Sequence, residues 1–193
     1  DFFTLPDGRL AFFLGDVSGK GMPAALFMIA VRTLIRHLAP AASGPADLLF
    51  RLNAALCADN PTNLYVTLVN GIYDPRDGGV VVATGGHPAP LLRRADGRVE
   101  PVDVQPGLMI GCAPVQPVYA DARLTLAPGE TLVLYTDGLT EAFDPDRRMF
   151  GLEGLCEALG GPRALLPLRQ CPEEVAAAVA RVTGQDELQD DQT

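Results

Sequence analysis

The stretch Gly15-Asp16-Val17-Ser18-Gly19-Lys20-Gly21-Met22-Pro23-Ala24-Ala25 decides the predicted fold, because it joins an apolar strand to a helix through a glycine-rich turn. The apolar run at residues 10–14 is typical of a strand, and Pro23 suits the first turn of a helix that begins at Met22. Residues 24–38 are apolar nearly all round, which predicts a helix buried on most sides. An acidic residue between a strand and such glycines lies where the backbone can approach a ligand closely.

Short apolar runs separated by turn residues predict a series of strands. The chain opens with two of them, at residues 2–5 and 10–14, around the turn Pro6-Asp7-Gly8. Further strands are predicted at residues 64–73, 80–84, 90–94, 98–102, 122–126 and 130–135. The last four flank Ala95-Asp96-Gly97 and Pro128-Gly129, so we expect two more hairpins there.

Helical patterns stand before and after these strands. A loop is predicted at residues 40–45 and an amphipathic helix at residues 46–56, and helices return at residues 152–159 and 172–182. There is no internal repeat and no long linker. Since tight turns indicate antiparallel pairing, we predict one α+β domain, in which two antiparallel sheets are covered by helices.

Composition excludes several classes of protein. The chain has 193 residues, 48% of them apolar, and 15 basic against 24 acidic side chains give a net charge of -9. The apolar fraction excludes a disordered chain, and the acidic surplus argues against binding to nucleic acid or to an anionic membrane. No apolar run is expected to reach membrane-spanning length. Four cysteines without paired spacing indicate a reducing cytoplasm.

Acidic residues stand at the ends of several apolar segments. Asp16 and Asp137 follow strands, Asp190-Asp191 follow the last helix, and Asp1 opens the chain. Carboxylates gathered at one rim repel each other unless a cation neutralises them, and an all-oxygen set favours Mg²⁺ or Mn²⁺ over Zn²⁺. Three of these positions also have a structural alternative: Asp137 in a plain turn, Asp190-Asp191 in a solvated tail, and Asp1 at a frayed terminus. Asp16 has the strongest signal, because the surrounding glycines require an unusual backbone path directly before a helix.

A phosphate-binding loop is the alternative for the glycine-rich stretch. Its spacing does not fit, because Gly15 and Gly19 enclose three residues where that loop needs four. Gly21 also stands where a Ser or Thr should follow the lysine, and the predicted hairpins do not supply a parallel sheet.

Seven short motifs, in one order along essentially the whole chain, resemble a known family. They are Asp1-Phe2-Phe3, Asp7-Gly8-Arg9-Leu10, residues 15–25, Asn63-Leu64-Tyr65-Val66-Thr67, Gly85-Gly86-His87-Pro88-Ala89-Pro90, residues 134–142 and Asp190-Asp191-Gln192-Thr193. Together they resemble the SpoIIE-type branch of the PPM family, the metal-dependent serine/threonine protein phosphatases. The resemblance implies an αββα sandwich of two antiparallel sheets, with two Mn²⁺ or Mg²⁺ ions at one edge.

The resemblance also implies a set of metal ligands. Asp16 would bridge both ions, and the backbone carbonyl of Val17 with Asp1, usually through water, would complete the shell of one ion. Asp137 and Asp190 would hold the other ion, with Asp191 as the alternative if the register slips by one residue. Two such ions activate a bridging water for in-line attack on the phosphoryl group.

Three further residues are candidate parts of the site, and two of them, Lys20 and His87, also have a structural interpretation. Ser18 takes the place of a histidine found in eukaryotic-type members, so that candidate proton donor is absent. Lys20, the only lysine, either attracts phosphate or is an exposed residue at a helix start. His87 either takes part in the chemistry or satisfies a backbone carbonyl at a strand end.

The sequence therefore predicts a phosphatase that acts on phosphoserine or phosphothreonine in a regulatory protein, by resemblance an anti-sigma-factor antagonist in bacterial partner switching. The alternative is a catalytically inactive module of the same fold that docks a partner. We expect this domain in the cytoplasm, with a homodimer as an open alternative and with a membrane tether open for a longer protein. The family's first and last strands and an upstream sensor domain are expected outside this sequence.

Overall fold

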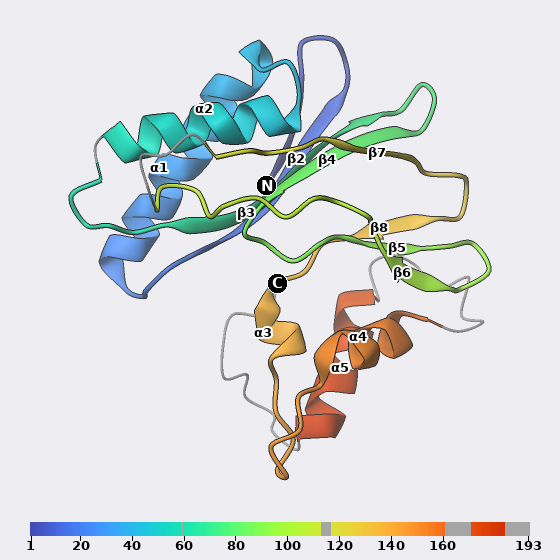
Figure 1. The fold of residues 1–193 in the computed structure, drawn as a ribbon. Helices are drawn as coiled ribbons and strands as arrows, with labels where there is room; N and C mark the ends of the chain where they lie inside the picture. Colours follow the sequence, from blue (N-terminus) through green and yellow to red (C-terminus); the bar gives the residue numbers. More distant parts are fainter. Residues whose placement is uncertain (59, 113–116, 161–170, 184–193) are drawn as a thin grey trace. The chain divides into compact units, whose positions relative to one another are not determined.

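The computed structural model describes residues 1–58, 60–112, 117–160 and 171–183. It divides into two compact units, of which unit 1 is Asp1–Ala89 with Asp103–Leu126, and unit 2 is Pro90–Val102 with Ala127–Thr193. Each unit contains one antiparallel sheet and its own helices (Figure 1). The predicted α+β class with two antiparallel sheets is confirmed.

The sheet of unit 1 has the strand order β1-β2-β3-β4-β7. Its strands are β1 (Phe2–Thr4), β2 (Leu10–Val17), β3 (Val66–Asp74), β4 (Gly79–Gly85) and β7 (Ala122–Thr125). The predicted hairpin at the start of the chain is confirmed, because β1 pairs with β2 and the Leu5 amide donates to the Arg9 carbonyl at 2.8 Å. Residue Gly8 in this turn has a φ of 87°, which glycine adopts at little cost.

Two helices cover one face of this sheet (Figure 1). The helix α1 (Met22–Leu38) begins where predicted, and α2 (Pro45–Ala58) follows a 3-10 turn, Ala39–Ala41, that lies partly within the predicted loop. Core residues shared by the helices and the sheet include Val31, Ile35 and Leu49, which are almost fully buried, together with Ala11 and Phe13 of β2.

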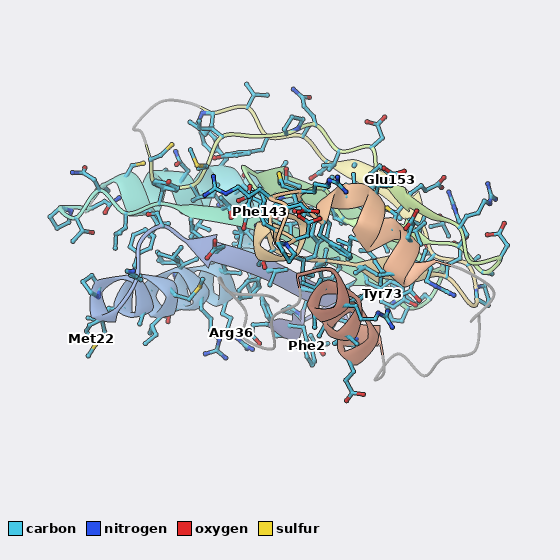
Figure 2. The ribbon with its side chains drawn as sticks, turned by 90° about the horizontal axis from the view of Figure 1, so that it is seen from below. Phe2, Met22, Arg36, Tyr73, Phe143 and Glu153 are labelled. Carbon is cyan, nitrogen blue, oxygen red and sulfur yellow. The ribbon has the colours of Figure 1, made fainter. Side chains whose placement is uncertain are left out.

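The segment Met22–Ala41 has one further property. By length and composition it could cross a membrane, which corrects the expectation that no apolar run is long enough. A helix packed on a protein core passes the same test, and Val31 and Ile35 pack into the core of unit 1. Its exposed apolar side chains, Met22, Leu26 and Ile29, lie in the first half of the helix; Figure 2 shows Met22 at its start.

The sheet of unit 2 has the order β6-β5-β8. Its strands are β5 (Leu91–Arg93), β6 (Val99–Pro101) and β8 (Thr131–Val133), and its helices are α3 (Asp137–Thr140), α4 (Gly151–Leu159) and α5 (Cys171–Thr183). The hairpin around Ala95-Asp96-Gly97 is confirmed, because β5 pairs with β6. The core of this unit includes Leu91, Tyr135, Leu155 and Val179.

The predicted hairpin around Pro128-Gly129 is wrong. The turn itself forms, since the Glu130 amide donates to the Ala127 carbonyl at 3.0 Å. However, β7 pairs with β4 in the first sheet, and β8 pairs with β5 in the second. A turn reverses the chain locally but does not choose the partner of each strand, which depends on long-range contacts.

Candidate functional site

Asp16 lies near the end of β2, on the face of the sheet opposite α1 and α2. Side chains alternate along a strand, and Ala11 and Phe13 pack into the helix-side core, so Asp16 belongs to the other face. Its register partner on β3 is Thr67. Asp16 is partly exposed and is the second-last residue of β2, so it lies near the end of the strand.

The backbone carbonyl of Val17, the residue after Asp16, lies outside the hydrogen-bond ladder between β2 and β3. Val66, the register partner of Val17, donates its N–H to the Ile110 carbonyl at 3.0 Å. Val17 and Val66 therefore form a non-hydrogen-bonded pair, in which the Val17 carbonyl is directed away from β3. A carboxylate and a backbone carbonyl on adjacent residues are hard oxygen donors, so this strand end fits Mg²⁺ or Mn²⁺.

The loop after Val17 is fixed by Ser18. The Ser18 amide donates to the Tyr65 carbonyl at 2.9 Å, and the Ser18 hydroxyl oxygen accepts a hydrogen bond from the Tyr65 amide, also at 2.9 Å. Ser18 therefore attaches the start of the loop to Tyr65 through both its amide and its hydroxyl group. Gly19 and Gly21 then have positive φ angles of 83° and 80°, and Lys20 between them is exposed.

His87 is connected to Asp16 through Thr67, the register partner of Asp16 on β3. The His87 Nδ1 atom is 2.9 Å from the Thr67 hydroxyl, and His87 is only 6% exposed. The Thr67 hydroxyl is also 3.5 Å from the backbone carbonyl of Asp16. Sequence analysis named Thr67 within the motif at residues 63–67 and on a predicted strand, but gave it no role.

Asp137 belongs to unit 2, where it is the first residue of α3. The Asp137 carbonyl accepts hydrogen bonds from the Glu141 amide at 2.7 Å and from the Thr140 hydroxyl at 3.2 Å. Thr136 before it is buried, whereas Asp137 itself is partly exposed. The backbone of Asp137 is thus fixed by a short helix, which sequence analysis did not predict.

Asp190 and Asp191 lie outside the described residues. Within the ranges that the structure does describe, no three His, Cys, Asp or Glu side chains form a group that could hold a metal ion. The full ligand set implied by the resemblance therefore stays a prediction, in which Asp16 and the Val17 carbonyl are the part with a defined local geometry.

Asp1 has different partners from those expected of a metal ligand. Its Oδ2 atom accepts hydrogen bonds from Arg32 Nε and Arg36 Nε, each at 2.8 Å. Arg32 and Arg36 are one helical turn apart in the sequence, but nothing in the sequence connects them with Asp1. The structure therefore brings the Asp1 carboxylate to the two arginines of α1.

The family comparison covers nearly the whole chain. A model of the family described as Stage II sporulation protein E (SpoIIE) matches residues 6–193. Two curated relatives are protein IcfG of Synechocystis, 28% identical over 82% of this chain, and phosphoserine phosphatase RsbU of Bacillus subtilis, 26% identical over 66% of it. These alignments cover 29% of IcfG and 38% of RsbU, so the chain corresponds to about a third of either relative.

Solved structures share the fold. The SiaA-PP2C domain of Pseudomonas aeruginosa superimposes with a TM-score of 0.84 at 23% identity, and the match covers all of this chain and 76% of that one. At this identity the likeness concerns the fold alone, and it agrees with the two antiparallel sheets and flanking helices. Together with the family match over residues 6–193, it shows that the chain belongs to the SpoIIE family, a branch of the PPM phosphatases.

Proposed function

We propose that this chain is the catalytic domain of a metal-dependent phosphatase that hydrolyses phosphoserine or phosphothreonine in a regulatory protein. The observation that carries the proposal is the end of β2, where the Asp16 carboxylate adjoins a Val17 carbonyl outside the β2–β3 ladder. Ser18 fixes the chain just after these two donors through its bonds to Tyr65. Membership of the SpoIIE family over residues 6–193 supports the reaction class.

The proposed site contains residues of two kinds, those that would hold cations and one that would attract phosphate. Asp16, Val17 and Asp137, with Asp190 or Asp191, would hold two Mn²⁺ or Mg²⁺ ions. When bound, such a pair lowers the pKa of a water nucleophile and neutralises charge on the phosphoryl oxygens. Lys20 lies exposed four residues after Asp16, where its ammonium group adds an attraction for a phosphorylated side chain.

For the substrate we propose an anti-sigma-factor antagonist in a bacterial partner-switching pathway. The support is the relationship to RsbU, which is called a phosphoserine phosphatase and matches 66% of this chain. Free thiols at Cys57, Cys112 and Cys156 support a reducing compartment such as the cytoplasm.

Phosphate release from a phosphoserine peptide in the presence of Mn²⁺ tests the reaction. The wild-type chain should release phosphate, and Asp16→Ala and Asp137→Ala should each lower kcat at least about 100-fold, because each removes a ligand of the cations. Asp103→Ala, which removes an exposed carboxylate elsewhere in unit 1, should keep wild-type kcat.

Wild-type activity in both the Asp16 and the Asp137 variant would contradict the mechanism. Calorimetric titration with Mn²⁺ separates the enzyme from an inactive docking module of the same fold. The enzyme should take up Mn²⁺ in a way that depends on Asp16, whereas a module with dead sites should show no uptake that depends on a carboxylate.

A further inference from the structure

We infer that Asp1 is a positioning residue that ties α1 to the edge strand β1, and that it lies outside the shell of the cations. The inference rests on the proposed function, since it concerns the same metal site. It departs from the ligand set that the family resemblance implies, in which Asp1 completes the shell of one ion. Four observations on unit 1 carry it.

The first observation is that the Asp1 carboxylate has no acceptor position left. Its Oδ2 atom accepts from Arg32 Nε and Arg36 Nε, each at 2.8 Å. Its Oδ1 atom accepts from Arg36 Nη2 at 3.0 Å and from the Phe2 amide at 2.8 Å. A carboxylate offers about four lone-pair sites, so a cation could bind here only by displacing one of these donors.

The second observation is the face of the sheet on which Asp1 lies. Asp1 and Phe13 exchange both backbone hydrogen bonds, each at 3.0 Å, so they are directly opposite each other across β1 and β2. Opposite residues share a face, and Phe13 is on the face covered by helices. Asp16 is on the other face and about 10 Å farther along β2, at roughly 3.3 Å per residue.

The third observation is that Arg36 contacts β1 in three ways. Besides the Asp1 carboxylate, its Nη2 donates to the Phe2 carbonyl at 3.3 Å, and its guanidinium lies 4.7 Å from the centre of the Phe3 ring. Arg36 of α1 and Phe2 of β1 are both labelled in Figure 2. A planar guanidinium can make the forked hydrogen bond and the ring contact together, which a lysine cannot.

The fourth observation is that α1 has few fully buried residues to hold it against the sheet. Of its 17 residues only Val31 and Ile35 are fully buried, and Met22, Leu26 and Ile29 in its first half are exposed. Met22 follows directly after Gly21, the end of the loop that leads from Asp16 and Val17 at the end of β2. The attachment of α1 to β1 therefore sets the direction in which the chain leaves the metal-binding strand end.

The test removes each side of the attachment separately. Asp1→Asn keeps the shape of the side chain and removes its charge, and Arg32→Gln/Arg36→Gln leaves Asp1 intact without its partners. Asp7→Asn/Arg9→Gln, which removes an ion pair in the exposed turn of the first hairpin, is the matched control. Each variant is measured by Tm in EDTA, by calorimetric titration with Mn²⁺, and by kcat and KM on the phosphoserine peptide.

If Asp1 is a positioning residue, Asp1→Asn and the arginine double variant should behave alike. Both should lower Tm by about 2–4 °C. The triple variant that combines all three substitutions should lower Tm little further, because the same cluster is lost in each case. Both should keep the wild-type number of Mn²⁺ ions and lose several-fold in kcat at saturating Mn²⁺ with KM unchanged. The Asp7/Arg9 control should match the wild type in all three measurements.

Two outcomes would overturn the inference. If Asp1→Asn loses one equivalent of Mn²⁺ while the arginine variant binds Mn²⁺ as well as the wild type or better, Asp1 is a metal ligand. If both variants keep wild-type kcat, the cluster does not position the site. Failure of the wild type to bind Mn²⁺ would instead contradict the proposed function, and the Tm comparison in EDTA would still decide whether Asp1 and the two arginines act as one cluster.

Discussion

At the scale of single residues, Thr67 connects Asp16 with His87, which is 71 positions farther along the chain. Its backbone pairs with Asp16 across the sheet, and its hydroxyl is 2.9 Å from Nδ1 of His87. Because His87 is buried, a polar partner for its ring is worth more than it would be in water. The contact favours a structural role for His87 in holding the strand end beside the site.

Replacing the Thr67 hydroxyl tests this contact. Thr67→Val preserves the shape of the side chain and leaves Nδ1 of His87 without that partner, so the free energy of unfolding should fall by about 1–3 kcal/mol. Thr67→Ser keeps a hydroxyl and should lose clearly less. Urea denaturation of the two variants measures the difference, and equal losses would show that the hydroxyl does not stabilise the fold.

The residues of the site were predictable to different degrees. Asp16 and Val17 stand in a glycine-rich motif between a strand and a helix, and local sequence was enough to predict their place. The partners of Asp1 were not, because Arg32 and Arg36 are more than 30 residues away and nothing local links an arginine on a helix to a particular strand. Contacts between distant segments leave no periodic pattern in the sequence.

At the scale of elements, the start of α2 shows how a distant segment completes a helix. The amide of Ala46, in the first turn of α2, donates to Asp121 Oδ1 at 2.8 Å, and Asp121 directly precedes β7. Gly44 allows this approach, because a Cβ atom there would lie 2.8 Å from the same carboxylate. The sequence predicted the helix from its amphipathic pattern but could not identify a capping residue 75 positions away.

Removal of this cap should destabilise the chain. Asp121→Ala leaves a helix N–H without its acceptor, and such changes cost about 0.5–2 kcal/mol in the free energy of unfolding. Asp103→Ala, which removes an exposed aspartate of the same unit, is the control and should change stability by less than about 0.5 kcal/mol. Thermal and urea denaturation compare the two variants, and equal effects would exclude a capping role.

At the scale of the whole molecule, the net charge is -9, and several of the carboxylates form ion pairs with neighbouring arginines. Hydrogen bonds from neighbouring arginines lower the pKa of four carboxyl groups, those of Asp7, Asp47, Asp74 and Asp96. The pKa of Glu130 is lowered by the backbone amide of Ala127 and then by Arg94. For Asp74 the side-chain and backbone hydrogen bonds of Arg76 lower the pKa to about 2 from 3.8. Composition alone showed the surplus but not this pairing with neighbouring arginines.

These lowered pKa values predict the response of the fold to acid. A carboxyl group whose pKa is lower in the folded chain stabilises it above the unfolded pKa, and this contribution is lost as pH falls through the folded pKa. The free energy of unfolding should therefore decrease between about pH 4 and pH 2. Asp74→Asn should make that decrease shallower in urea denaturation at pH 4, 3 and 2, and a slope equal to that of the wild type would contradict the assignment.

The α+β class followed from local turns and periodicity, but the division into two units did not, because it depends on which strand each segment pairs with. The separation of β7 from β8 is the clearest case: one short connection carries the chain from one sheet to the other.

That connection has a consequence for how the chain must acquire its structure. The sequence of unit 1 is interrupted by Pro90–Val102, which contains β5 and β6 of unit 2. The strand β5 pairs with β8, which follows β7 in the sequence. On a ribosome, β5 and β6 therefore emerge before their remaining partner strand exists. A chain cut after Leu126 would contain all of unit 1 with an orphan hairpin inserted in it, so neither unit can be separated from the other by a single cut.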